Sequence, residues 1–222
     1  MTRGRGLSVR DTGGRGGLRS GDEARVHAAW DRIETWLAAN APRTLATLSG
    51  PADEDDVRGA ERALEVTFPP GLVASLRRHN GVRGETPDGN VDPAAFCLPS
   101  EDRLLSTEEI VARTRFLRSV QGDDAGAGAW WHPGYVQIGS YDITADGTVV
   151  DCREGDGHGR TGAFSRTSGT DFTGPASLGL LLAATADALQ QGRGTLIDLD
   201  EEEIDEDDPD AAPLAERAVI WD

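Results

Sequence analysis

Residues 130–138 read WWHPGYVQI, and at this stretch the spacing of apolar residues changes from helical to alternating. The run Tyr135 to Ile138 predicts a strand. Asp146-Gly147 is a hairpin-type turn signal that leads into a second strand at Thr148 to Asp151, and Ala163 to Ser165 is a third candidate. Strands gather in the middle of the chain and helices flank them, so the sequence predicts an α+β fold rather than alternating βαβ units.

Helical spacing of apolar residues predicts five helices around this centre. They span roughly residues 20–40, 53–64, 70–79, 106–120 and 178–191. The first and fourth open with capping boxes at Ser20 to Glu23 and at Ser106 to Glu109. The third stops at His79-Asn80-Gly81, where glycine supplies a left-handed cap. A short strand is also predicted at residues 96–98.

The length of 222 residues suits one domain with tails. Residues 1–20 are rich in glycine and arginine and lack apolar periodicity, so they are predicted to be a disordered N-terminal tail. The domain itself is expected over residues 21–192. An acidic linker at 193–215 then leads to a terminal strand at 216–222 that returns to the domain.

The net charge is −17, which argues against nucleic-acid binding because that function needs a basic face. The same charge suits a basic protein as partner. The longest apolar run, Leu178 to Ala186, is too short to span a bilayer, and the N-terminus lacks the apolar stretch of a secretory signal. We therefore expect a cytoplasmic protein that binds neither membrane nor nucleic acid, in which Cys97 and Cys152 are unpaired core thiols.

The sequence lacks the common catalytic and metal-binding signatures. There is no lysine and hence no P-loop, and neither G-x-S-x-G nor H-E-x-x-H occurs. One G-x-G-x-x-G, Gly157 to Gly162, does not open a helix and predicts a hairpin loop. The calcium-like run Asp142 to Gly147 has Arg153 where a bidentate glutamate is needed, and the histidines lack metal-ligand spacing. We expect no catalytic residue, metal or cofactor.

An aromatic cluster is the first candidate for binding a partner. It consists of Trp130, Trp131, His132 and Tyr135. If exposed, the cluster would anchor a partner, and if buried, it would pack the entrance of a strand into the core. Both interpretations stay open. The second predicts that at least one of the two tryptophans is buried against the helix that contains Leu178 to Leu189.

An acidic tract is the second candidate for binding a partner. It consists of Glu201, Glu202, Glu203, Glu206, Asp207 and Asp208. These carboxylates cannot enter a core unpaired. The tract is either a solvated connection to the last strand or a surface that steers a basic partner and raises its association rate.

Several segments, taken in order, resemble the SUKH superfamily, which includes bacterial immunity proteins of polymorphic toxin systems and a fungal regulator of cell-wall assembly. The segments are Trp30…Ile33…Trp36-Leu37, Gly50-Pro51-Ala52, Phe68-Pro69, His79-Asn80-Gly81, Leu104 to Ile110, residues 130–138 and the terminal Ile220-Trp221. The resemblance implies a central, mainly antiparallel sheet flanked by helices in a single domain. It also implies no known catalysis and a function in binding another protein.

The sequence leaves three hypotheses about function open. The first is an immunity protein that neutralises a cognate toxin by direct binding, with a basic toxin domain as its partner. The alternative is a regulatory or scaffold module related to the control of cell-wall assembly. The third is a small-ligand binder or an unrecognised enzyme, which would have a deep pocket with convergent polar groups. The sequence makes no prediction of the oligomeric state.

Overall fold

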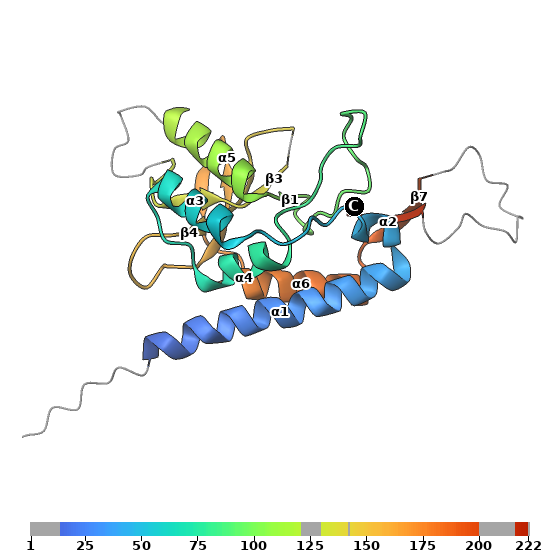
Figure 1. The fold of residues 1–222 in the computed structure, drawn as a ribbon, viewed down its shortest axis with the longest axis horizontal. Helices are drawn as coiled ribbons and strands as arrows, with labels where there is room; N and C mark the ends of the chain where they lie inside the picture. Colours follow the sequence, from blue (N-terminus) through green and yellow to red (C-terminus); the bar gives the residue numbers. More distant parts are fainter. Residues whose placement is uncertain (1–13, 121–129, 142, 200–215, 222) are drawn as a thin grey trace, which may run out of the picture.

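The computed structural model describes residues 14–120, 130–141, 143–199 and 216–221 (Figure 1). Its helices are α1 (Gly14–Asn40), α2 (Pro42–Leu45), α3 (Glu54–Leu64), α4 (Pro70–Arg78), α5 (Thr107–Val120) and α6 (Leu178–Gln190). Its strands are β1 (Arg103–Leu104), β2 (Tyr135–Gln137), β3 (Gly139–Ser140), β4 (Gly147–Asp151), β5 (Thr161–Ser165), β6 (Gly169–Asp171), β7 (Thr195–Asp198) and β8 (Arg217–Ile220). The predicted α+β fold class is confirmed.

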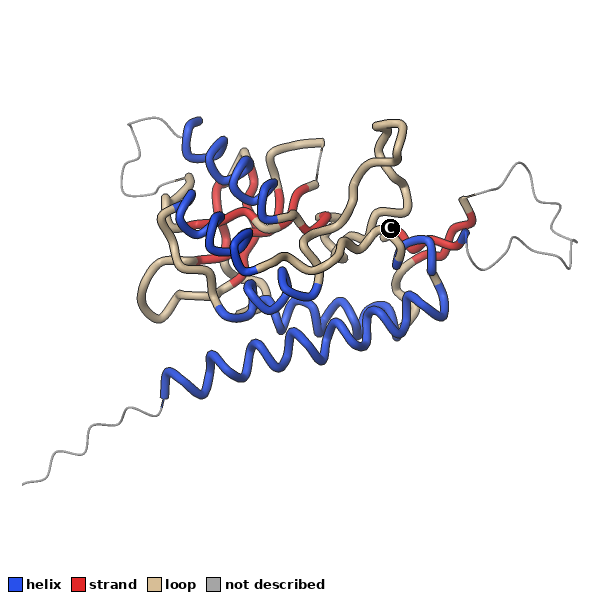
Figure 2. Tube along the Cα trace, viewed as in Figure 1, coloured by secondary structure: helices blue, strands red, loops and turns tan. Residues whose placement is uncertain are grey.

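The central sheet has four antiparallel strands in the order β2-β4-β5-β6, and Figure 2 shows the strands gathered among the helices. Every residue of β4 is buried. Because side chains alternate across a strand, Val150 joins the large hydrophobic cluster of the protein while Val149 joins a smaller one. The sheet is therefore covered on both faces. Two further antiparallel pairs, β1-β3 and β7-β8, lie outside it.

Helices α1, α4 and α6 pack together as one layer, along the lower edge of Figure 1, and α3 packs beside α5 above them. The apolar stripe predicted for the first helix, Val26, Trp30, Ile33 and Leu37, has no exposed surface. Trp30 also donates a hydrogen bond from Nε1 to Ser75 Oγ of α4 at 3.1 Å. This bond satisfies the polar atom of a fully buried ring, so the stripe packs without leaving an unpaired donor there.

A charged cluster ties the end of α4 to α1. Arg78 donates to both oxygens of Glu34, from Nε to Oε1 and from Nη2 to Oε2, each at 2.6 Å. His79 Nε2 lies 2.9 Å from Glu34 Oε1, and His79 Nδ1 lies 2.9 Å from the Ser49 carbonyl oxygen. Burial raises the pKa of Glu34, but hydrogen bonds from Arg78 and His79 outweigh it and leave that pKa below its usual value.

The start of α1 differs from the sequence-based expectation. The helix begins at Gly14 and so includes the last part of the stretch expected as a disordered tail, while residues 1–13 lie outside the described part of the chain. Residues 20–23 therefore lie inside α1 and do not form its N-terminal capping box. Adding residues to the end of a packed helix costs far less free energy than nucleating a new helix. A stretch without apolar periodicity can therefore still be helical.

Residues 96–98, expected as a strand, form a loop. Within the described residues they take part in one isolated bridge, from Cys97 to Arg103. Phe96 and Leu98 have no exposed surface. These two side chains are apolar because they are buried in the core, and the segment does not pair as a strand. A run of three apolar residues is too short to tell a buried loop from a strand.

The C-terminal segments form a hairpin that packs on α2. Strand β7 lies within the segment 193–215 that the sequence suggested as an acidic linker, and it pairs with β8. The terminal strand returns to the domain, since Val219 is only 3% exposed and its N–H donates to Thr44 Oγ1 at 3.0 Å. Beyond the strand, Trp221 donates from Nε1 to the Cys97 carbonyl oxygen at 2.9 Å.

Gly179 lies where α6 packs against α1, and we expect Gly179→Ala to destabilise the fold. A Cβ at this position would lie 2.6 Å from Asp22 Oδ1 and 3.0 Å from the Asp22 carbonyl oxygen, so the two helices would have to separate. Overpacking of this kind typically costs about 1–3 kcal/mol. Gly59→Ala in α3 is the control, because its Cβ would meet nothing within 4 Å. Urea unfolding that shows equal stability for both variants would contradict the close approach of α1 and α6.

The Glu34 cluster should make stability depend on pH. Its lowered folded-state pKa means that Glu34 stabilises the fold above its unfolded pKa and loses this effect as pH falls through the folded pKa. We expect Glu34→Gln to cost about 1–2 kcal/mol at neutral pH and progressively less in acid. Thermal unfolding across a pH series measures this difference.

Glu54→Gln is the matched control for this series. Glu54 pairs with Arg58, but both side chains are more than half exposed, so its removal should cost about 0.5 kcal/mol or less. A Glu34→Gln loss that is as large in acid as at neutral pH would show that the carboxylate charge is not the cause.

Candidate protein-interaction site

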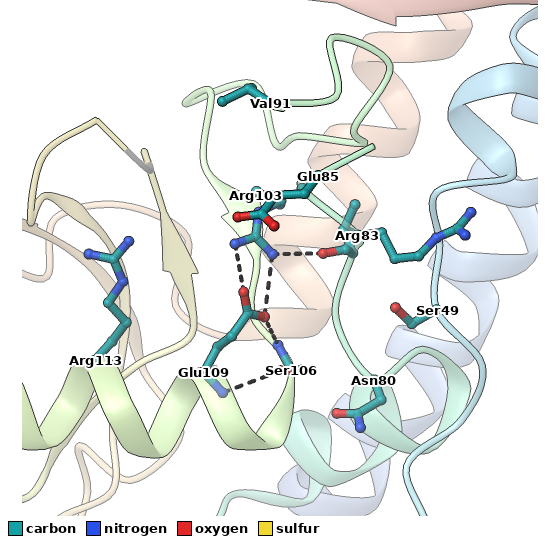
Figure 3. Close-up of a pocket in the computed structure, with 11 residues that line it drawn as sticks. Ser49, Asn80, Arg83, Glu85, Val91, Arg103, Ser106, Glu109 and Arg113 are labelled. Carbon is teal, nitrogen blue, oxygen red and sulfur yellow. Dashed lines mark hydrogen bonds and ion pairs between the residues drawn. The ribbon is translucent and has the colours of Figure 1, made fainter. Parts of the chain in front are cut away.

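The start of α5 positions the first charged side chain of the candidate site. Ser106 and Glu109 form the predicted capping box: Glu109 N donates to Ser106 Oγ at 3.2 Å, and Ser106 N donates to Glu109 Oε2 at 2.8 Å. These bonds hold the Glu109 carboxylate back over the first turn of α5, where Figure 3 shows it facing Arg103.

Arg103, on β1, pairs with this carboxylate. Its Nη2 donates to Glu109 Oε1 and its Nη1 to the Val82 carbonyl oxygen, both at 2.7 Å, and the residue is only 8% exposed. Burial raises the pKa of Glu109, yet the hydrogen bonds from Arg103 and Ser106 outweigh it, so this pKa lies below its usual value. Glu109 is therefore ionised at neutral pH with both oxygens occupied, which makes it a poor general base.

The turn at residues 79–81 fixes the wall opposite Glu109. Asn80 Oδ1 accepts a hydrogen bond from Thr107 N at 2.8 Å. Gly81 has φ +75°, and a Cβ there would lie 2.6 Å from the carbonyl carbon of Leu105. Glycine alone suits both this conformation and this space. The predicted helix stop thus also holds the start of α5.

The hollow between this turn and α5, here called the polar cleft, has a volume of about 600 Å³. Its charged lining residues are Arg83, Arg103, Arg113, Glu85 and Glu109. In Figure 3, Arg83 and Arg113 lie on opposite sides of the Arg103–Glu109 pair. The Arg103–Glu109 pair has no net charge. The other charged lining residues are Arg83, Arg113 and Glu85, so the lining has a net positive charge. A positive excess stands out in a chain whose net charge is −17.

A second hollow, here called the apolar groove, has a volume of about 220 Å³ and shares Gly84, Val91 and Arg103 with the polar cleft. Its apolar lining residues include Pro93, Tyr141, Ile143, Ile220 and Trp221. Val91 is 79% exposed and Ile143 is 83% exposed, more than any other large hydrophobic residue in the described ranges. Large apolar side chains that lie together on the solvent-exposed surface indicate an interaction site.

The structure divides the aromatic cluster that the sequence singled out. Trp131 has no exposed surface and packs with Leu117, Val149 and Phe164, so it is a core residue. The expectation that a tryptophan is buried is confirmed, but its expected partner was wrong. Trp131 lies against α5 and the sheet, because α6 packs its apolar face on α1 and α4.

Trp130 is half-buried at the edge of the same cluster. Its ring meets Phe164 edge-on at a centroid distance of 4.6 Å, and its Nε1 donates to the Arg166 carbonyl oxygen at 2.9 Å. With Phe116 and Val120, which are each half exposed, it lines a separate apolar hollow of about 430 Å³. Trp130 therefore borders an open hollow with exposed apolar residues.

His132 and Tyr135 are also half-buried and contact each other, with ring centroids 5.3 Å apart. The Arg153 guanidinium lies over the Tyr135 ring at 4.9 Å. Gly134 N donates to His132 Nδ1 at 2.9 Å. Burial, and then the charge of Arg153, lower the pKa of His132. Neither ring lines the polar cleft or the apolar groove.

The six acidic candidates, at 201–203 and 206–208, lie outside the described residues. Within the ranges that the structure does describe, no group of three or more His, Cys, Asp or Glu side chains could hold a metal ion. Over those same ranges, no helix combines the length and apolar character needed to cross a membrane.

Sequence reasoning missed both the polar cleft and the apolar groove. Their lining residues come from segments far apart in the chain, so no local spacing unites them. One signal was present: Val91 and Ile143 are single large apolar residues within the otherwise polar stretches RGETPDGNVDP (83–93) and DITADG (142–147). Such residues are either buried when the chain folds or remain exposed, where a partner can bind them.

Comparisons with known proteins agree on one family. The model of the SMI1 / KNR4 family (SUKH-1) matches residues 51–175, which include every lining residue of the polar cleft except Ser49. A KNR4/SMI1 homolog from Eremothecium gossypii is 35% identical over 92 residues, covering 41% of this chain and 13% of the relative. Another from Kluyveromyces lactis is 35% identical over 103 residues, covering 46% and 18%.

The cell wall assembly regulator SMI1 of Saccharomyces cerevisiae is 33% identical over 92 residues, covering 41% of this chain and 17% of the relative. The chain thus spans less than a fifth of the length of each of these three relatives.

The two tryptophans test how the aromatic cluster is divided. Trp131→Ala should lower stability by about 3–5 kcal/mol, since the whole ring is buried. Trp130→Ala should cost clearly less, because this ring keeps contact with solvent. Guanidinium unfolding followed by circular dichroism compares the two. A Trp131→Ala variant as stable as the wild-type chain would mean that Trp131 is not a core residue.

Proposed function

Because this chain belongs to the SMI1 / KNR4 family (SUKH-1), we propose that it is a regulatory module that acts by binding another protein. The partner in this proposal is a protein that takes part in the control of cell-wall assembly. Support comes from the relative in Saccharomyces cerevisiae, whose name is cell wall assembly regulator. We further propose that the module works in the cytoplasm.

The binding proposal rests on the exposed pair Val91 and Ile143. Both line one groove and both are about four-fifths exposed. Burying an aliphatic side chain of this size contributes roughly 1.5–3 kcal/mol, so a partner that covers both gains a substantial part of its binding free energy from them. The neighbouring Arg103–Glu109 pair is already held in place, so little side-chain entropy is lost on binding there.

The chemistry of the polar cleft supports binding better than catalysis. Glu109 is ionised and bonded through both oxygens, and Arg103 is bonded to Glu109 and Val82. Small-molecule sites are mostly apolar with a few polar groups, whereas this larger hollow has a strongly charged lining. A ligand-binding or enzymatic role is therefore the weaker alternative.

An immunity role is the second form of the binding proposal. Its motivation is the net charge of −17, which suits a basic toxin domain as partner. The relatives named above are all fungal, and one is named for cell wall assembly, so they support the regulatory form better.

Affinity purification from the native host tests the proposal. The full chain serves as bait beside two double variants, Val91→Ser with Ile143→Ser in the apolar groove and Leu180→Ser with Leu196→Ser elsewhere. Leu180 and Leu196 are 41% and 43% exposed, so the control double also removes exposed apolar surface, and thermal unfolding checks that every bait is folded. We expect at least one protein to be enriched about tenfold by the wild-type and control baits and lost with the groove variant.

The identity of the captured protein separates the two forms. A protein of cell-wall assembly, whose gene deletion gives the same wall phenotype as deletion of this chain, supports the regulatory form. A toxin encoded beside this chain supports the immunity form. If no protein is enriched over a tag-only bait by quantitative mass spectrometry, the binding proposal is wrong.

A further inference from the structure

The apolar groove has room for one or two side chains of a partner. Its volume of about 220 Å³ lies below the roughly 300–1,000 Å³ of small-molecule pockets. Trp221 gives it a fixed aromatic wall, since its Nε1 donates to the Cys97 carbonyl oxygen at 2.9 Å. Val91 and Ile143 give it exposed aliphatic rims. A pocket of this kind suits the aliphatic or aromatic anchor residue of a protein partner.

The charged residues that line this groove are Asp92, Glu101 and Arg103, and two of the three are already paired. Asp92 is 6% exposed, and its two carboxylate oxygens accept from Arg43 Nη2 at 3.0 and 3.2 Å. Arg103 is 8% exposed and donates to Glu109 Oε1 at 2.7 Å. The charges of Asp92 and Arg103 are therefore balanced by neighbours within the chain.

Glu101 is the third charged residue, and its charge is not balanced. The residue is exposed, and its carboxylate makes no hydrogen bond or ion pair within the described part of the chain. The turn that carries it is fixed at both ends. Glu101 N donates to the Leu98 carbonyl oxygen at 2.8 Å, Leu98 N donates to the Asp102 carbonyl oxygen at 2.9 Å, and Leu98 and Asp102 are buried. The groove thus has one unpaired negative charge at a fixed position on its wall.

The backbone of Glu101 is strained, and glutamate is a poor choice for the stability of this turn. Its φ is +63°, in the left-handed region that glycine adopts at little cost. A glycine here would relieve the strain. A side chain that costs stability and makes no polar contact of its own in the described chain is available to a partner.

Given the proposed binding function, we infer that the apolar groove receives a segment of the partner protein that carries one apolar anchor residue and, close to it, a lysine or arginine. The anchor packs among Val91, Ile143 and Trp221, and the basic side chain pairs with Glu101. Charge complementarity favours the basic residue, because Glu101 and the net charge of −17 would both repel an acidic one. The regulatory and the immunity forms of the binding function both allow such a segment.

A phage-displayed library of random 12-residue peptides provides a defined probe for this segment. The full chain is the target, and binders to the Val91→Ser, Ile143→Ser double variant are removed by counter-selection. We expect the selected peptides to share an aliphatic or aromatic residue with Lys or Arg at a constant short spacing from it.

Synthetic copies of a selected peptide then locate its basic residue by fluorescence anisotropy. Glu101→Gln should weaken binding about three- to fivefold, the range of an exposed ion pair. Glu108→Gln is the control, because Glu108 is also exposed but does not line the groove. Replacing the basic residue of the peptide by glutamine should cost a similar factor. It should cost much less when the chain already carries Glu101→Gln, because the two changes remove one shared interaction.

Glu101→Gly separates the binding role of this residue from a role in the fold. We expect this variant to melt at or above the temperature of the wild-type chain, since glycine suits the left-handed backbone, and to bind the peptide as weakly as Glu101→Gln does. A lower melting temperature together with unchanged peptide binding would show that Glu101 serves the turn and not a partner.

Three further outcomes would overturn the inference. They are selected peptides that are acidic or uncharged beside the anchor, no selected peptide at all, and a dimer in light scattering that Ile143→Ser abolishes, which would assign the groove to a second copy of the chain. If affinity purification still yields a partner that depends on Val91 and Ile143, the binding function stands and only the basic segment is wrong.

Discussion

The turn at His79-Asn80-Gly81 joins three helices, and the candidate site depends on it. His79 reaches Glu34 on α1, and Asn80 accepts from the first backbone amide of α5. Gly81 lies so close to the backbone at Leu105 and Ser106 that no other residue fits. The distance between the polar cleft walls is therefore set by backbone contact, which is far stiffer than contact between long side chains.

The elements that sequence predicts well are those decided by neighbours three or four positions away. The buried stripe from Val26 to Leu37 and the capping box of Ser106 and Glu109 are of this kind. The strand Tyr135–Gln137 and the turn before β4 follow from alternation and from Asp146-Gly147 in the same local way. These elements are determined by local sequence and do not depend on contacts with distant parts of the chain.

The features that sequence cannot supply are those decided at a distance. Trp130 and Trp131 have the same chemistry and adjacent positions, yet one borders solvent and the other is fully buried. Arg103 lies on a strand of two residues, too short to show any period. Aromatic density near residue 131 left two interpretations open, a binding surface and a strand entrance packed into the core. In a chain with only 5% aromatic residues, the core takes up Trp131.

Contacts between the two ends of the chain have a kinetic consequence. Asp22 on α1 accepts from Ser177 at the cap of α6, 155 positions away, and Thr44 accepts from Val219, 175 positions away. Pairings of such long range slow folding, because the loop between them must close before any contact stabilises it. Until α6 is in place, the apolar stripe of α1 stays partly uncovered. A newly made chain thus has a period in which it is prone to aggregate, and this period lasts until its C-terminal helix packs.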